Sequence, residues 1–378
     1  MKRSFLTSRR LALLSVGVVL ALSIGLSGCF NADQSTTAPA PPAVGVFNMS
    51  NPQVQSLVAV QKRHTAHLMA DPDVIGTAIT VNDQHKPAIL LLVTSRRAME
   101  AAPKTLDGVP VKIMLTDRIV AMKGKPGGGG GGHGKVDHKA KQTAPIQLGT
   151  SGGWTHDLAN GFCCGGTLGS LIQVGGQQRI LSNYHVFEAD IVSGGNNLVA
   201  KTGDAIIQPG LIDVNCNAAN AQNVATLVVT KSLPNSNVDC SSANVISGMV
   251  DPSGAILEVG TLSAQTVAAS IGQAVKKSGR TTGLSRSSIT GLNATVSVSY
   301  EDECAGNTAF TKTFTGQIIV KNRGSKFLNS GDSGSLMVED VSTNPRAVGL
   351  LFAGSSSTAV ANPINDVLAF LGANMVGN

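Results

Sequence analysis

Short apolar runs separated by glycine-containing turns make up residues 143–378, and they constrain the fold more than any other feature. The chain of 378 residues has 43 glycines, and Val, Ser and Thr recur throughout this region. Apolar runs of strand length that are bounded by turn residues are typical of β-strands. Only residues 364–371, near the end, are expected to form a helix. The sequence therefore predicts an all-β fold for this region.

One of these turns carries residues suited to chemistry. Residues 331–335 read Gly-Asp-Ser-Gly-Ser, and the apolar run 336–338 follows at once. Glycines allow the backbone to approach a carbonyl closely and to direct N–H groups at it. Ser333 is therefore a candidate nucleophile for acyl transfer, although the same residue types also form ordinary turns.

A serine hydroxyl needs a base, and the base needs an acid that orients it. Among seven histidines, His185 is the one in an apolar, strand-like run, residues 180–186, that leads into a turn. Asp239 lies between His185 and Ser333 in the sequence, and its small and apolar neighbours favour burial. Three other aspartates in polar surroundings are interpreted as solvated loop residues: Asp190, Asp213 and Asp251.

The order His, Asp, Ser, with Gly-Asp-Ser-Gly at the serine, resembles the chymotrypsin-like (trypsin-fold) serine peptidases. Residues 164–169 resemble the strand before the histidine in that family, and residues 277–283 resemble a segment of the bacterial, α-lytic-type branch. Residues 347–354 resemble the strand along which the substrate backbone pairs. The resemblance covers residues 144–376 and implies two six-stranded antiparallel β-barrels with the site between them.

The resemblance implies a role for each residue of the site. Ser333 would attack the scissile carbonyl, His185 would transfer the proton, and Asp239 would orient His185. The backbone N–H groups of Gly331 and Ser333 would form the oxyanion hole.

Asp332 would then be buried beneath the oxyanion hole and would need a positive partner. In the α-lytic-type branch this partner is the arginine of the Gly-Arg-Thr-Thr-Gly segment, which is Arg280 here. We therefore expect an ion pair between Arg280 and Asp332.

Some positions depart from the family pattern. Leu351 stands where many relatives have a serine that supports the acid, and Val186 stands where many have a disulfide cysteine. Phe327, six residues before Ser333, is expected to form part of the specificity pocket, together with residues 351–353, which are Leu351, Phe352 and Ala353. The absence of an aspartate at position 327 argues against cleavage after Lys or Arg and favours an apolar or small residue.

The first 43 residues indicate where the protein works. Basic residues precede an apolar run, residues 11–26, which is shorter than the roughly 20 residues that span a bilayer, so residues 1–28 are interpreted as a lipoprotein signal peptide. Residues 26–29 resemble a bacterial lipobox, which implies acylation of Cys29 and a membrane anchor. Residues 29–43 read as a flexible tether. The expected location is the cell envelope, at the outer membrane of a Gram-negative bacterium.

Residues 44–123 are predicted to form a small α+β domain. The apolar spacing favours a helix over 53–69, and apolar runs predict strands over 74–81, 88–93 and 109–115 with a short helix over 95–102. A pro-region and a binding module for an envelope partner are both consistent with such a domain.

Residues 124–142 are a Gly/Lys/His-rich linker that cannot build a core. It is interpreted either as a cleavage point that frees the following domain, residues 143–378, or as a basic segment that lies on anionic lipid.

Six cysteines fit an oxidising compartment. With Cys29 acylated, five remain, which predicts two disulfides and one spare thiol without fixing the pairs: Cys163, Cys164, Cys216, Cys240 and Cys304. The adjacent Cys163 and Cys164 are not expected to bridge each other.

No cofactor, metal or nucleic-acid partner is expected. The net charge of +6 is spread along the chain, and aromatic residues make up only 3%. Two functions remain open: a serine endopeptidase that acts on peptides or proteins, and a catalytically silent trypsin-fold binding protein of the envelope. Ester hydrolysis by the same residues is a minor third function. The sequence leaves the oligomeric state undetermined.

Overall fold

The computed structural model describes residues 47–122, 124, 136–159, 162–188, 198–300 and 310–378. All of these belong to one compact unit, Val44–Asn378. The expectations for the signal peptide, the tether and Cys29 lie outside the described residues, as do those for most of the linker and for Cys304.

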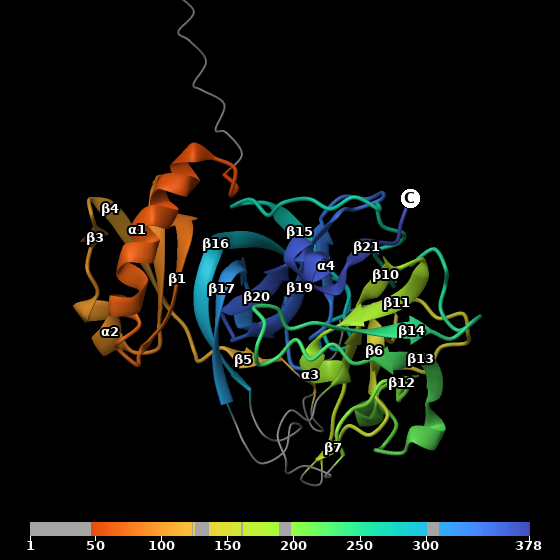
Figure 1. Ribbon diagram of the computed structural model, residues 1–378. Helices are drawn as coiled ribbons and strands as arrows, with labels where there is room; N and C mark the ends of the chain where they lie inside the picture. The colour runs from red at the N-terminus through yellow and green to blue at the C-terminus, as the bar shows by residue number, and fades with distance from the viewer. Residues whose placement is uncertain (1–46, 123, 125–135, 160–161, 189–197, 301–309) are drawn as a thin grey trace, which may run out of the picture. The chain divides into compact units, whose positions relative to one another are not determined.

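Six antiparallel strands in the second half of the chain close into a barrel, which we call the second barrel (blue and teal in Figure 1). They are β15 (Ala274–Lys277), β16 (Ser285–Tyr300), β17 (Phe310–Lys321), β18 (Leu336–Glu339), β19 (Ala347–Gly354) and β20 (Thr358–Pro363). The order is β15-β18-β19-β20-β17-β16, and pairing of β15 with β16 completes the ring. Buried and partly exposed side chains alternate along residues 293–300 of β16, as expected for a strand with one face in a core.

A first barrel, green in Figure 1, is built the same way from residues 150–245. Its strands are β6 (Thr150–Trp154), β9 (Gly166–Leu168), β10 (Ser170–Val174), β11 (Gln177–Ser182), β12 (Ala205–Gln208), β13 (Gln222–Val228) and β14 (Ser241–Val245). The order runs from β10 through β11, β14, β13, β12 and β6 to β9. Because only Gly169 separates β9 from β10, the first and last strands of this series are one chain segment and the barrel is closed, with β21 (Ala373–Met375) pairing on the outer edge of β10. The fold is thus the predicted trypsin-like double β-barrel.

The remaining elements are short. They are β7 (Leu158–Ala159), β8 (Phe162–Cys163), α3 (Tyr184–Phe187), the 3₁₀ turns η1 (Leu211–Asp213), η2 (Ala218–Asn220) and η3 (Arg323–Ser325), α4 (Ile364–Leu371) and β21 (Ala373–Met375). The terminal helix predicted over 364–371 is confirmed as α4.

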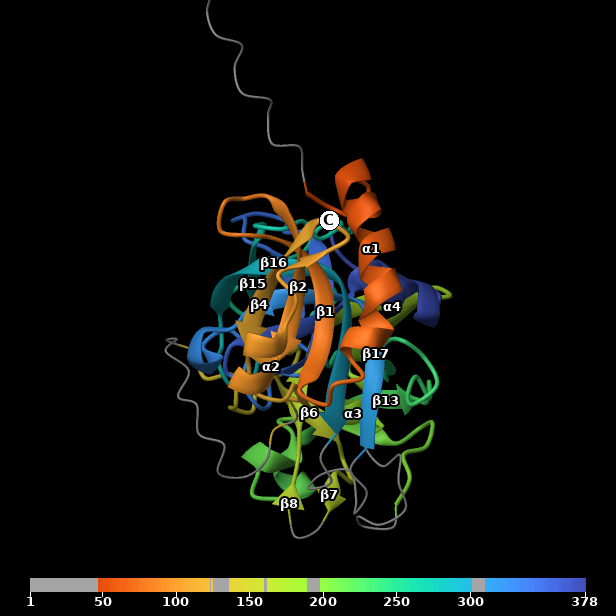
Figure 2. The same ribbon diagram turned by 90° about the vertical axis from the view of Figure 1, so that its left-hand side faces the viewer.

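Residues 47–121 contain two helices and five strands. They are α1 (Pro52–Leu68), β1 (Val74–Val81), β2 (Pro87–Val93), α2 (Arg96–Ala101), β3 (Thr105–Leu106), β4 (Val109–Leu115) and β5 (Val120–Ala121). Asn51 caps α1 by accepting a hydrogen bond from Gln53 N, and Pro52 occupies the first turn. Figure 2 shows α1 beside β1, with β2 and β4 next in the sheet. The two helices and three longer strands expected from the sequence are confirmed.

These elements pack directly on the second barrel. Strand β1 pairs antiparallel with β16, so the small sheet continues the barrel sheet. Ile75 and Leu90 share a buried cluster with Val296 and Phe314. Gln61 donates to the carbonyl of Asn293 over 2.9 Å. The domain boundaries predicted from the sequence stay a prediction, but residues 47–122 share a core with the second barrel.

Cys163 and Cys216 form a disulfide, and Cys164 is disulfide-bonded as well, with a partner outside the described residues. Cys240 is a free, buried thiol. Two disulfides and a spare thiol were expected, and the adjacent cysteines do not bridge each other. No helix in the described part of the chain is long and apolar enough to cross a membrane.

Candidate active site

His185 and Asp239 meet because the strands that carry them are neighbours. His185 lies on α3, directly after β11, and Asp239 directly precedes β14, which pairs with β11. The Nδ1 atom of His185 lies 2.6 Å from Oδ2 of Asp239, and the backbone N–H of His185 donates to Oδ1 over 3.3 Å. Both side chains are almost completely buried. The carboxylate thus holds Nδ1–H as the donor and leaves Nε2 as the acceptor.

Tyr300 supports Asp239 and was missed in the sequence. Its hydroxyl donates to Oδ2 of Asp239 over 2.8 Å. Burial and the nearby Asp239 carboxylate raise the pKa of Tyr300 well above its usual value, so the hydroxyl stays a donor. The supporting hydrogen bond that Leu351 cannot provide therefore comes from a different strand, β16. The one available signal was that Tyr300, one of only two tyrosines, ends an alternating strand.

The turn that carries Ser333 requires its two glycines. Gly331 and Gly334 have φ angles of 96° and 90°, which favour glycine. A Cβ at Gly331 would lie 2.7 Å from Nη1 of Arg280, and one at Gly334 would lie 2.4 Å from the carbonyl oxygen of Thr167. The side chain of Thr167, on β9 of the first barrel, donates to the carbonyl of Gly331 over 2.9 Å. The turn that carries Ser333, in the second barrel, is thereby attached to the first barrel.

Ser333 is buried, and its hydroxyl donates to the carbonyl of Phe352 over 3.1 Å. The Nε2 atom of His185 is buried without a hydrogen-bond partner among the described residues. Gly166 lies between the residue after His185 and the residue Ser333. A Cβ at Gly166 would lie 2.6 Å from Val186 and 3.0 Å from the carbonyl oxygen of Ser333. The described contacts thus join His185 to Asp239, but they do not include a hydrogen bond between Ser333 and His185.

The predicted ion pair between Arg280 and Asp332 is wrong. Asp332 pairs with Lys277, whose Nζ lies 3.1 Å from Oδ2. Its carboxylate also accepts the N–H groups of Thr281 and Thr282, at 2.9 and 3.1 Å, and that of Asn329 at 2.9 Å. Burial lowers the pKa of Lys277, and the carboxylate of Asp332 opposes that effect. Lys277 is the last residue of β15, and it supplies the positive charge. The turn after this strand, which contains Arg280, binds Asp332 through backbone N–H groups and not through the arginine side chain.

Arg280 points instead to the first barrel. Its Nε and Nη2 atoms each lie 2.6 Å from an oxygen of Asp213, in a buried, two-pronged ion pair. The side chain of Asp213 is only 8% exposed. The interpretation of Asp213 as a solvated loop residue was therefore wrong, because its turn packs against the second barrel.

Among the residues predicted to form the specificity pocket, some contribute side chains to a buried cluster and others contribute backbone atoms. Phe327 and Leu351 belong to one buried cluster of the second barrel, together with Leu328. The ring of Phe352 packs against Phe314, 4.9 Å away, in a different cluster, while its carbonyl accepts the hydroxyl of Ser333. Ala353 lies opposite Ala121 in the backbone pairing of β19 with β5.

A segment of the chain itself lies between β19 and the turn that carries Ser333, a place that we call the cleft. Strand β5 pairs antiparallel with β19, with Ala121 opposite Ala353. The N–H of Met122 donates to the carbonyl of Phe352 over 3.0 Å, and the N–H of Gly331 donates to the carbonyl of Met122 over 2.6 Å. Gly331 thus binds a peptide carbonyl through the N–H that was predicted to line the oxyanion hole.

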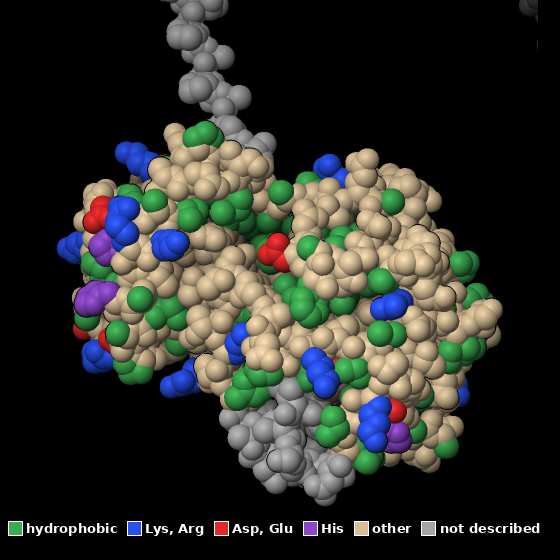
Figure 3. Space-filling model, viewed as in Figure 1, with side chains coloured by type: hydrophobic (Ala, Val, Ile, Leu, Met, Phe, Trp, Pro, Cys, Tyr) green, Lys and Arg blue, Asp and Glu red, His purple; other side chains and the backbone are tan. Residues whose placement is uncertain are grey.

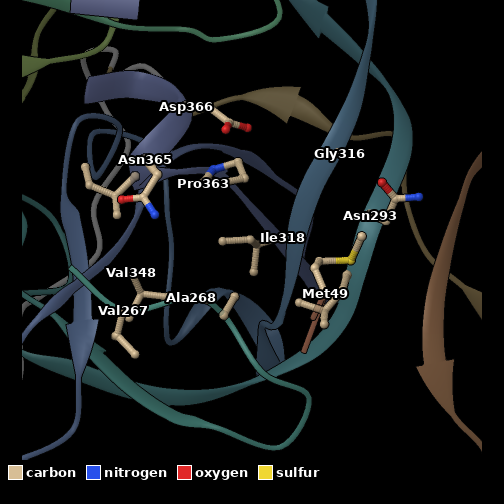
Figure 4. A pocket seen from close by; sticks show the side chains of 13 residues that line it. Met49, Val267, Ala268, Asn293, Gly316, Ile318, Val348, Pro363, Asn365 and Asp366 are labelled. Atoms are coloured by element: carbon tan, nitrogen blue, oxygen red, sulfur yellow. The ribbon is translucent and has the colours of Figure 1, made fainter. Parts of the chain in front are cut away.

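A pocket of the second barrel is lined by other residues than those predicted for the site. Figure 4 shows a pocket lined mainly by apolar side chains, among them Met49, Val348 and Ile318, with Asp366 at its edge. Burial raises the pKa of Asp366 above its usual value. On the face shown in Figure 3, Lys and Arg side chains lie apart from one another. The described residues include no group of three or more side chains able to hold a metal ion.

Comparisons with known proteins give the following. A family model described as the Nal1 C-terminal domain matches residues 222–362, fewer than half of the chain. No curated protein matches. A glutamic acid specific serine protease is 18% identical, with 61% of this chain and 100% of that chain covered and a TM-score of 0.39. Protease A of Thermobifida fusca is 19% identical (62% and 99% covered, TM-score 0.40), and a homologue of alpha-lytic protease is 17% identical (61% and 98%, 0.35). At such low identities and TM-scores, these likenesses carry no inference about activity.

Proposed function

We propose that this protein is a serine endopeptidase that cleaves peptide bonds through an acyl-enzyme, with Ser333, His185 and Asp239 as its catalytic residues. The observation that carries the proposal is the buried His185–Asp239 pair, supported by Tyr300, beside a glycine-flanked serine turn whose Gly331 N–H binds a peptide carbonyl. These groups supply a base, an orienting acid and an oxyanion donor.

The reaction starts with a change in the hydrogen bond of Ser333. Rotation about the Cα–Cβ bond of Ser333 frees its hydroxyl from the carbonyl of Phe352 and offers it to the free Nε2 of His185. His185 takes the proton while Oγ attacks the substrate carbonyl, and the Gly331 N–H stabilises the oxyanion. His185 then protonates the leaving amine, and water hydrolyses the ester in the reverse sequence of proton transfers.

A fluorophosphonate probe tests this proposal. We expect it to label the wild type at Ser333 and not to label Ser333→Ala. The matched control is Ser335→Ala, which removes a buried hydroxyl two residues away and should keep labelling. Both the intact chain and the chain cut within residues 125–135 are tested. Failure to label either form, or equal labelling of Ser333→Ala, would refute the proposal.

The second candidate function is a catalytically silent binding protein with the same fold. One observation favours it: the hydroxyl of Ser333 is bound to Phe352 rather than to His185. Persistent absence of labelling together with unchanged peptide binding in Ser333→Ala would establish this function.

We also propose that the protein is lipid-anchored in the cell envelope. The support is the sequence alone: a basic start, an apolar run of 16 residues at 11–26, and the lipobox-like residues 26–29 that end in Cys29. Metabolic labelling with a radioactive fatty acid should mark the wild type and not Cys29→Ser. Equal labelling of both, or of neither, would contradict the anchor.

A further inference from the structure

Residues 120–122 and Gly124 contact the site as a bound peptide would. Val120 and Ala121 pair with Gly354 and Ala353 of β19. The N–H and the carbonyl of Met122 bond to Phe352 O and Gly331 N, at 3.0 and 2.6 Å. Gly124 follows on the opposite side, where its N–H donates to the carbonyl of Gly165, in the first barrel, over 2.8 Å. The segment therefore crosses the cleft and is held by both barrels.

The side chain of Met122 fills the pocket expected to set specificity. It is 7% exposed and belongs to the buried cluster that contains Phe327 and Leu351. A Cβ at Gly354 would lie 3.2 Å from Cε of Met122 and 3.2 Å from Leu328, so the glycine leaves room for a long side chain. A pocket with apolar walls favours an unbranched apolar side chain over a charged one, because a buried charge here would have no compensating partner on these walls.

We propose that the peptide bond after Met122 is the first substrate of the chain's own active site, and that this site prefers methionine or a similarly long apolar residue at the cleaved position. The inference rests on the proposed function. It adds the bond that is cut and the substrate class, which the fold does not supply.

The step is an ordinary acyl transfer within one chain. Oγ of Ser333 bonds to the carbonyl carbon of Met122 as its proton passes to Nε2 of His185. The bond from Met122 to the nitrogen of Lys123 breaks, and that nitrogen takes the proton from His185. Water then attacks the ester, which returns a hydroxyl to Ser333 and leaves a carboxylate on Met122 and a free amine on Lys123.

Self-cleavage is tested on the full-length chain by intact mass spectrometry and N-terminal sequencing. Wild type should yield two pieces, the second beginning at Lys123, while Ser333→Ala stays whole. The rate constant should not depend on protein concentration, because the carbonyl of Met122 is already bound to Gly331 of the same chain. A cut at another bond, or equal cutting of Ser333→Ala, would overturn the inference.

Variants at position 122 test the specificity. Met122→Asp should slow the cut at least tenfold, and Met122→Leu should keep it within about threefold, in line with the modest effect of conservative apolar changes. The control is Met99→Asp, because Met99 is 37% exposed on α2, outside the cleft, and the rate should not change. Equal rates for Met122→Asp and wild type would exclude the pocket assignment.

Labelling separates the two proposals. If Ser333 reacts with the fluorophosphonate probe and wild type nevertheless stays whole on prolonged incubation, the inference fails while the peptidase function stands. If Ser333 fails to react in the intact chain and in the chain cut within residues 125–135, the peptidase function fails, and the inference fails with it.

Discussion

Asp239 is held by groups that are far apart in the sequence. Its carboxylate contacts His185 and Tyr300, its N–H donates to Asn362 over 2.9 Å, and its carbonyl accepts from Asn183 over 2.7 Å. A carboxylate without these donors would be buried at a high energetic cost. The contacts fix the direction in which the carboxylate faces His185, which is the orienting role proposed for it.

Tyr300→Phe tests how much this support contributes. A hydrogen bond to a charged group is worth about 1.5–3 kcal/mol, so kcat/KM for a peptide substrate should fall roughly tenfold to a hundredfold. Phe310→Leu is the control, because it removes the ring stacked 4.6 Å from Tyr300 and keeps the hydroxyl. If Tyr300→Phe retains full activity, or if Phe310→Leu loses as much, Tyr300 has no orienting role.

The partners of Arg280 are tested by a double-mutant cycle in urea unfolding. Arg280→Met should cost about 3–5 kcal/mol, because it leaves the buried Asp213 carboxylate unpaired. The added change Asp213→Leu should recover most of that loss. Arg286→Met, in a pair where the arginine is 56% exposed, should cost about 1 kcal/mol or less. If Arg280→Met is instead relieved by Asp332→Asn, the assignment to Asp213 is incorrect.

At the scale of elements, an ion-pair cluster ties α2 to the turn before β1. Arg97 lies 2.7 Å from Asp71 and 2.8 Å from Asp73. The hydrogen bond from Arg97 is the largest cause that lowers the pKa of Asp71, and the hydroxyl of Ser95, followed by Arg97, lowers that of Asp73. Because both pKa values lie below those of the unfolded chain, their stabilisation is present above about pH 4. It is lost as the pH falls through the lowered values.

The lowered pKa values of Asp71 and Asp73 give a prediction about how the free energy of unfolding depends on pH. Arg97→Met should lower the urea midpoint at pH 6, and the difference from wild type should vanish near pH 2, where both carboxylates are protonated in either state. Salt at 1 M should shrink the difference at pH 6, since Arg97 is exposed and the two aspartates are partly exposed. The control is Arg96→Met on the same helix, for which no ion pair is described. A difference that grows towards pH 2 would contradict this account.

On the scale of the whole molecule, residues 47–122 are attached to the second barrel by pairing of β1 with β16 and by pairing of β5 with both β16 and β19. The first contact buries a shared apolar cluster, which does not depend on the peptide bond after Met122. Cutting the chain between 47–122 and the barrels should therefore leave the pieces together.

Gel filtration tests this attachment after cleavage at a protease site introduced within residues 125–135. The two pieces should elute as one species under native conditions and separate in denaturant. Ala78→Asp, which places a charge in the buried cluster, should release the smaller piece, whereas Met99→Asp at an exposed position should not. Elution of separate pieces from the otherwise unchanged cut chain would show that the shared core is too weak to hold them.

Local patterns were enough to predict much of the fold and of the candidate site. Alternation, apolar runs and turn residues gave the two helices and three longer strands of residues 52–115 and the helix α4, because those signals depend on near neighbours. The tight turn at residues 331–334 was predicted from its glycines for the same reason, and Gly331 and Gly334 have positive φ angles there. The closeness of His185 and Asp239 followed from a resemblance, and the structure places them within hydrogen-bond distance.

Long-range pairing decided the rest, and no local pattern encodes it. Whether Asp332 pairs with Lys277 or with Arg280 depends on how the turn after β15 faces the two barrels. In the structure Lys277 pairs with Asp332, while Arg280 pairs with Asp213, which is far from it in the sequence. Tyr300 reaches Asp239 only because the end of β16 lies next to the residues before β14, and Met122 lies against Gly331 only because β5 pairs with β19. Sequence by itself determined the strands and the reactive residue types, since those follow from neighbouring side chains. Tertiary structure alone decided which charges pair and what fills the cleft, because both depend on distances between segments that are remote along the chain.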